Sequence, residues 1–202
     1  MNRSFIIVAV ALLAFPLGAG AYGPFDYTNP EHVREKLPIV EQYHFNINVE
    51  NLTGTMPGGS IGDHLWYVIR SFPNHHRALN AMARLWRESL QEGRTPRGLD
   101  PEKTPDFLFY RAMRFAPHDG VVPLLYAIHL HRMKKYDQAL KMYKRAEELL
   151  PRSAELHYNL GLLYVARREY GLALSHARQA YKLGYPLPGL KTKLIAAGVW
   201  KE

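Results

Sequence analysis

The second half of the chain is similar to itself at a fixed offset. At this offset YDQAL at 136–140 aligns with YGLAL at 170–174, and Ala146 aligns with Ala180. Small residues recur in the second copy at spacings of four and three, which places them on one face of a helix: Ala173, Ala177 and Ala180. In a short array each unit depends on its neighbours, so the offset predicts supersecondary units that stack on one another.

Further residues mark the helices within the unit. The first copy closes at Pro151, and Leu160-Gly161-x-x-Tyr164 lies between the copies. Small Gly161 lets a neighbouring helix approach, while Leu160 and Tyr164 fill the space beside it. These residues resemble the tetratricopeptide repeat (TPR), a helix–turn–helix unit of about 34 residues, which is also the offset between the two copies. The resemblance implies an all-α fold, a short solenoid of TPR-like helical hairpins, from about residue 63 to residue 198.

The resemblance also divides the chain into regions. The predicted regions are a signal peptide at 1–21, an irregular acidic segment at 22–62, TPR-like repeats at 63–187 and a C-terminal capping helix at 188–202. Weaker matches extend the repeats toward the N-terminus. They give a half repeat at 63–73 and a repeat with an insertion at 74–118, ahead of the two regular repeats at 119–152 and 153–187. A capping helix is expected because the terminal units of a solenoid must cover its apolar ends.

The N-terminus has the three-part pattern of a secretory signal peptide. Arg3 precedes an apolar run from Phe5 to Phe15, and small residues follow up to Ala21. This run is too short for a bilayer, which needs about 20 apolar residues, and no later stretch is apolar enough to span one. We therefore expect a periplasmic or secreted protein with no stable membrane span after cleavage. Cleavage before Tyr22 and retention of the leader as an anchor are both compatible with the pattern.

The segment after the leader differs from the repeats in charge. Residues 22–66 hold six acidic and two basic side chains, whereas residues 67–202 hold 23 basic and 12 acidic ones. Between Glu41 and Glu50 apolar residues alternate with polar ones, which predicts one short half-buried strand. No second strand is apparent, and an unpaired strand edge tends to recruit another chain. The segment is therefore expected either to lie across the basic repeats or to mediate self-association.

The resemblance implies where a partner binds. In TPR solenoids the first helix of each hairpin lines a concave groove, and helical spacing assigns the groove residues. They are Asn80, Arg84, Arg87, Leu124, Leu125, Ile128, His131, Tyr158, Asn159, Leu162 and Val165. This groove is cationic at one end and apolar at the other, so it fits a partner protein or peptide with an apolar stretch and an acidic residue or C-terminus. We expect a non-catalytic scaffold of the cell envelope; filling of the groove by the front segment or the final helix is the alternative.

A second binding hypothesis rests on basic residues around one predicted turn and the helix that follows it. They are Arg132, Lys134, Lys135, Lys141, Lys144 and Arg145. Because an exported protein meets little nucleic acid, nucleic acid is not an expected partner. An anionic envelope polymer or surface is the alternative ligand for such a cluster.

An enzyme is the alternative from a different class. The chain has no cysteine, no G-x-S-x-G and no H-E-x-x-H, so no catalytic residue, metal site or cofactor is predicted. A metal-dependent hydrolase would need histidines of the first half to converge within metal-ligand distance of one point, from among His32, His44, His64, His75 or His76. The sequence places these histidines in separate local contexts, which favours structural roles.

Overall fold

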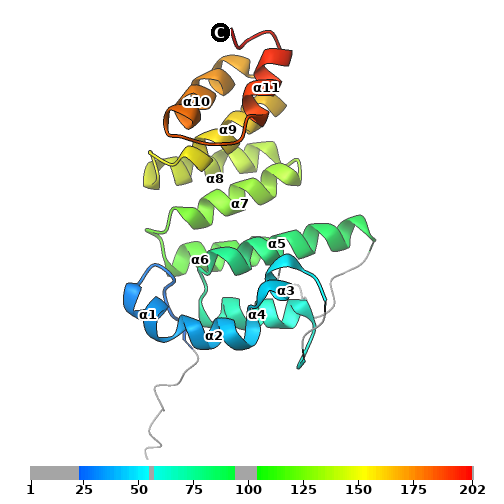
Figure 1. Cartoon of the computed structure of the whole chain (residues 1–202), viewed down its shortest axis with the longest axis vertical. Coiled ribbons are helices and arrows are strands. Elements are labelled where there is room, and N and C mark those ends of the chain that lie inside the picture. Colours follow the sequence, from blue (N-terminus) through cyan, green and yellow to red (C-terminus); the bar gives the residue numbers. More distant parts are fainter. Residues whose placement is uncertain (1–22, 55–56, 94–103, 202) are drawn as a thin grey trace, which may run out of the picture.

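The computed structural model describes residues 23–54, 57–93 and 104–201. Within these ranges the chain forms eleven α-helices and no strand, stacked along one long axis from the N-terminal part to the C-terminus (Figure 1). The predicted signal peptide and the centre of the predicted insertion lie outside the described residues. No helix in the described ranges is long and apolar enough to cross a membrane. The predicted all-α stack is confirmed.

Two hairpins form the rear of the stack: α7 (Val121–Arg132) with α8 (Tyr136–Leu149), and α9 (Ala154–Ala166) with α10 (Tyr170–Lys182). Their turns are equivalent. Lys134 and Arg168, which hold the same position in the two copies, both have a positive φ, near 60°. The following amides donate to equivalent carbonyl oxygens, Lys135 to Leu130 and Glu169 to Tyr164, each at 2.9 Å. This left-handed helix end satisfies backbone carbonyl groups that have no partner within the helix. The two copies of the repeat therefore share a backbone conformation as well as a side-chain pattern.

The predicted small-residue stripe is the contact surface of α10. Ala173, Ala177 and Ala180 are fully buried, and α10 packs along α9. The open end of this hairpin is covered by α11 (Gly189–Ala196), which buries Leu190 and Leu194. Gly161 in α9 faces this helix: a Cβ atom added to it would lie 2.5 Å from Cδ2 of Leu190. The absence of a side chain at residue 161 therefore allows α11 to pack on α9.

Three helices precede the regular hairpins: α4 (Ile61–Ser71), α5 (His76–Gln91) and α6 (Pro105–Phe115). Helix α4 begins with a capping box, in which Ser60 and Asp63 each accept a hydrogen bond from the other's backbone amide. Helix α5 packs on α4, α6 and α7, so it connects the front of the molecule to the rear hairpins. One hydrophobic core continues through all of these helices.

The prediction of an irregular segment with a strand at 41–50 is wrong. The chain there forms α1 (Pro30–Glu35), α2 (Leu37–His44) and α3 (Ile47–Asn51). Asn46 decides the local structure, because its side chain accepts from the amides of Asn48 and Val49 and starts α3 as a cap. The four alternating apolar residues then divide: Phe45 and Val49 are buried, whereas Tyr43 and Ile47 are 62% and 65% exposed.

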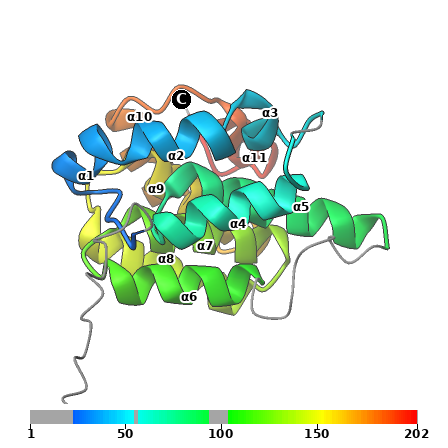
Figure 2. The same ribbon diagram turned by 90° about the horizontal axis from the view of Figure 1, so that it is seen from below.

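The segment lies across the front helices (Figure 2): α2 packs on α4, and α3 packs on α4 and α5. Ion pairs add to this contact, since Arg77 of α5 binds the carboxylates of Glu41 and Glu50. The acidic segment therefore packs on its own repeats, as one of the two predicted arrangements requires.

Candidate functional site

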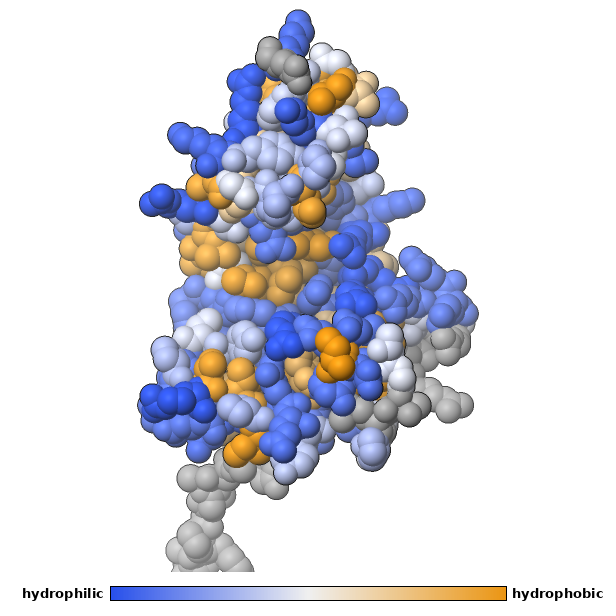
Figure 3. Space-filling model, in the orientation of Figure 1, coloured by the Kyte–Doolittle hydropathy of each residue, from blue (hydrophilic) through white to orange (hydrophobic). Residues whose placement is uncertain are grey.

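The first helices of the hairpins, α5, α7 and α9, are neighbours in the stack, since α7 contacts both α5 and α9. Half-buried apolar side chains occupy equivalent positions on two of them, with Ile128 on α7 and Leu162 on α9 at the same place in successive copies of the repeat. Apolar atoms gather in a band on the surface at the level of α7 (Figure 3). We define the α7–α9 face by five half-buried residues: Leu125, Ile128, His131, Leu162 and Val165.

The predicted cationic end of the groove is not free. Arg84 lies against α3, with guanidinium nitrogens 3.5 Å from the carbonyl oxygen of Glu50 and 3.4 Å from that of Asn51. Arg87 is half-buried and donates to Nδ1 of His129 on α7, 3.0 Å away. Burial, with the neighbouring charge of Arg132, lowers the pKa of Arg87 to about 10. The two arginines therefore join helices, and this end of the groove fits the alternative in which the front segment fills it.

The buried partner of Arg87 stays neutral. Burial, together with the positive charge of Arg87, lowers the pKa of His129 to about 4. At neutral pH its imidazole is uncharged and Nδ1 can accept the hydrogen bond from the guanidinium. This contact joins α5 to α7 beneath the surface.

The opposite end of the predicted groove is covered as well. Tyr158 is only 8% exposed because its ring stacks on Tyr185 of the α10–α11 connection, with ring centroids 4.2 Å apart. Leu124 is 2% exposed and belongs to the core, so it is not available to a partner. Asn159 is half-buried, and its amide nitrogen donates to the carbonyl oxygen of Glu155. Of the predicted groove residues outside the α7–α9 face, Asn80 on α5 is exposed.

The histidines considered in the hydrolase hypothesis form no group of three possible metal ligands among the residues that the structure describes. His75 donates from Nε2 to Glu41 at 3.0 Å, and Nδ1 of His32 accepts from the amide of Asp26. The Nδ1 atoms of His44 and His64 lie 3.1 Å apart. These contacts are local hydrogen bonds, and no carboxylate or third histidine joins the His44–His64 pair at metal-ligand spacing in the described part of the chain.

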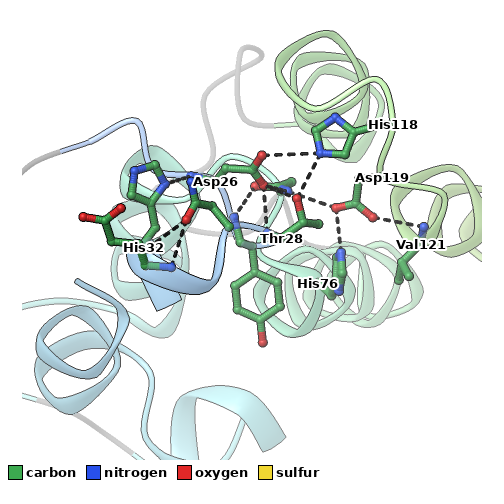
Figure 4. Close-up of polar contacts among 11 residues, drawn as sticks. Asp26, Thr28, His32, His76, His118, Asp119 and Val121 are labelled. Atoms are coloured by element: carbon green, nitrogen blue, oxygen red, sulfur yellow. Dashed lines mark hydrogen bonds and ion pairs between the residues drawn. The ribbon is translucent and has the colours of Figure 1, made fainter. Parts of the chain in front are cut away.

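His76 belongs to a polar network that holds the N-terminal segment against the α4–α5 and α6–α7 connections (Figure 4). It donates from Nε2 to Oδ2 of buried Asp119 at 2.7 Å, and Asn74 donates to the same oxygen at 2.9 Å. Asn74 also donates to Asp26 at 2.8 Å and accepts from the amide of Tyr27. Burial of Asp26 raises its pKa, but the hydrogen bonds from Thr28 and Asn74 outweigh that effect and lower it overall. The network joins three segments that are distant in sequence. Its hydrogen bonds hold these segments together, which is a structural role.

The predicted basic cluster lies on the surface, where five of its six side chains are exposed and Arg145 is half-buried. Two of its charges are paired: Lys135 is 3.5 Å from Asp106, and Lys144 is 2.9 Å from Glu147. Exposed pairs of this kind contribute little to stability. The cluster thus keeps a net positive charge beside one end of the α7–α9 face.

Residues 130–166, from the last turn of α7 through α8 to the end of α9, match the family model of the TPR repeat. The chain carries a TPR. The comparison with curated proteins finds no match. A TPR within an all-α stack of hairpins is typical of a protein–protein interaction module, because such repeats build extended binding surfaces from neighbouring helices.

The sequence did not predict one group of polar residues in the TPR region. Glu147, His157 and His176 lie together on α8, α9 and α10. No spacing motif connects them, because each comes from a different helix and only the stacking of the hairpins unites them. A search for histidine pairs within one helix misses such a group.

Proposed function

We propose that this protein is a non-catalytic TPR scaffold of the cell envelope that binds a partner protein or peptide on its α7–α9 face. The observation that carries the proposal is the band of apolar surface at the level of α7 (Figure 3), together with the half-buried Leu162 and Val165 on the neighbouring α9. Contiguous apolar surface on a folded chain marks interaction sites. The face lies between two contacts with other elements: Arg84 lies against α3 at one end, and Tyr158 stacks on Tyr185 of the α10–α11 connection at the other.

The chemistry of the face specifies the partner. Ile128 and Leu162 offer apolar contact, while the exposed basic residues Arg132 and Lys134 lie where α7 ends. An apolar segment followed by an acidic residue or carboxylate complements both features. Binding is then expected to weaken with added salt, because exposed charges are screened beyond about 8–10 Å at ordinary ionic strength.

Substitution of Ile128 by glutamate is expected to weaken partner binding at least tenfold. The new charge loses hydration when an apolar segment docks against it, which costs more than the lost contact alone. The partner is first captured with the wild-type protein from its own envelope fraction and identified, and its affinity is then measured with purified chains. Ile39→Glu is the matched control, because Ile39 is an exposed isoleucine on α2, remote from the face. Equal affinity of the Ile128 variant and wild type, with both folded, would contradict the proposal.

The envelope location is proposed from the leader at 1–21 and has its own test. Protein recovered from the envelope or the medium of the native cells is expected to begin at Tyr22 when sequenced from its N-terminus. Replacing Leu12 and Leu13 in the apolar run by arginines should keep the chain inside the cell at full length. Recovery of that variant outside the cytoplasm would remove the leader from the proposal.

The exposed basic cluster favours an anionic envelope polymer or surface as a second candidate ligand. Reversal of Lys134 and Lys141 to glutamate should abolish sedimentation with such a polymer at low salt if the polymer is the ligand. The same variant should retain an apolar peptide partner with reduced salt dependence. The two ligands are therefore separable by one variant.

A further inference from the structure

The group Glu147, His157 and His176 has the geometry of a metal site. The Nδ1 atoms of His157 and His176 lie 3.1 Å apart. Oε1 of Glu147 lies 3.9 Å from the first of these atoms and 4.0 Å from the second. In the plane of the three atoms, the point equidistant from them is about 2.1 Å from each, and zinc holds imidazole nitrogens and carboxylate oxygens at about 2.0–2.2 Å. We propose that these three side chains bind a divalent transition-metal ion, Zn²⁺ in particular.

A hydrogen bond to the backbone fixes the tautomer of His157. Its Nε2 lies 3.0 Å from the carbonyl oxygen of Pro151, and because a carbonyl only accepts, the ring proton is on Nε2. Nδ1 of His157 therefore carries a lone pair that can bind an ion. Metal-binding histidines commonly have their other nitrogen held by a backbone carbonyl in this way, which fixes both tautomer and ring orientation.

The other two ligands are also held in place. The ring of His176 stacks on Tyr164, with centroids 5.4 Å apart. The tautomer of His176 with its proton on Nε2 presents the lone pair of Nδ1 to the ion. Lys144 binds the other carboxylate oxygen of Glu147, Oε2, at 2.9 Å and leaves Oε1 for the ion.

The donor set indicates the metal. Two imidazoles and one carboxylate suit zinc and neighbouring first-row ions, in contrast to the all-oxygen sites of Mg²⁺ and Ca²⁺. Three protein ligands leave a further coordination position, out of the plane of the three atoms, to water, and the Glu147 side chain is 27% exposed, so solvent reaches the site. The ion would connect α8 of one hairpin to α9 and α10 of the next. It uses no residue of the α7–α9 face, so this proposal stands independently of the proposed function.

A second histidine pair in the same molecule provides an internal comparison. His44 and His64 also approach with their Nδ1 atoms 3.1 Å apart. Among the residues that the structure describes, no third side chain joins them into a group of metal-ligand geometry, whereas Glu147 joins the rear pair. The carboxylate of Glu147 lies beside His157 and His176, whereas none is placed to complete a site with His44 and His64. Zinc is therefore expected at His157 and His176.

Zinc titration of the full mature chain, purified without a polyhistidine tag, tests the site. Calorimetry and metal analysis after dialysis are expected to give one Zn²⁺ per chain. His176→Gln and Glu147→Gln should each weaken zinc binding at least 30-fold, because each removes one of three ligands. His44→Gln is the matched control and should bind zinc as wild type does. Co²⁺ in place of Zn²⁺ should give the visible absorption of a four-coordinate ion in the wild type and lose it in His176→Gln.

Thermal melting supplies a readout that also monitors folding. Zinc should raise the melting temperature of the wild type and of His44→Gln, because it binds the folded state, and should leave that of His176→Gln unchanged. Circular dichroism without zinc shows whether each variant is folded. If His176→Gln is not folded, Glu147→Gln, at a partly exposed position, provides the same test. Wild-type zinc affinity in folded Glu147→Gln, loss of binding in His44→Gln, or no stoichiometric binding to the wild type would overturn the proposal.

Discussion

Replacement of Gly161 by leucine should destabilise the rear of the molecule and release α11 from it. A Cβ atom at this position would lie 2.5 Å from Leu190 Cδ2 and 3.5 Å from the carbonyl oxygen of Ala173, before the rest of the side chain is placed. Overpacking of this kind costs about 3 kcal/mol, and the better helix propensity of leucine returns about 1 kcal/mol. A net loss of about 2 kcal/mol lowers the melting temperature of a chain this size by about 4–8 °C.

Limited proteolysis locates the damage. Because α11 covers the apolar end of α9 and α10, its release should expose Lys191 and Lys193 to trypsin while the front helices stay resistant. Gly171→Leu is the matched control, since a Cβ atom there meets no atom within 4 Å and the residue is exposed near the start of α10. Its melting temperature should equal or exceed that of wild type. Equal melting of the Gly161 variant and wild type would show that α11 does not pack on residue 161.

The sequence was sufficient for the rear hairpins because two independent signals agreed there. The offset between the copies set the period, and the residues Leu160, Gly161 and Ala173 identified which helix faces touch. Each of these contacts joins helices that lie close together along the chain, so a short sequence pattern is enough to predict it. The turns follow the same rule, since Lys134 and Arg168 adopt the same left-handed conformation.

The front segment was mispredicted because two local signals competed. Alternation from Tyr43 to Val49 has the period of a strand, but the cap at Asn46 divides the run between α2 and α3. Burial of Phe45 and Val49 then comes from packing against α4 and α5, which the alternation alone cannot specify. A capping asparagine within an alternating run outweighs the alternation when no partner strand exists.

The candidate binding face was predicted in part for a related reason. Helical spacing placed Leu125, Ile128 and Leu162 at the surface of the first helices, and the structure leaves them half-buried there. Helical spacing could not show that α3 lies against Arg84 or that Tyr185 covers Tyr158. Both α3 and Tyr185 belong to segments outside the repeated helices. The face is thus defined by the repeats, and its limits are set by the elements at either end.

Acidification should destabilise the fold between about pH 6.5 and pH 4, because its buried histidines must become charged. Burial lowers the pKa of His129 to about 4, and it also lowers the pKa values of His75 and His131. Within this window the unfolded chain binds more protons than the folded chain, so the free energy of unfolding falls as the pH falls. Full stability is present above pH 6.5, and His129 alone accounts for a loss of about 3 kcal/mol on reaching pH 4.

Urea unfolding at a series of pH values measures the contribution of His129 when wild type is compared with His129→Gln. Glutamine keeps an oxygen that accepts from Arg87, but it does not titrate, so the variant should lose stability less steeply between pH 6.5 and pH 4. His118→Gln is the control, because His118 is exposed and its contact with Asp26 is at the surface. Glu50, whose pKa is lowered by its hydrogen bond to Arg77, adds acid sensitivity equally in all three proteins. The difference in slope therefore isolates the imidazole between α5 and α7, and parallel curves for His129→Gln and wild type would show that this imidazole is already protonated or solvated in the folded protein.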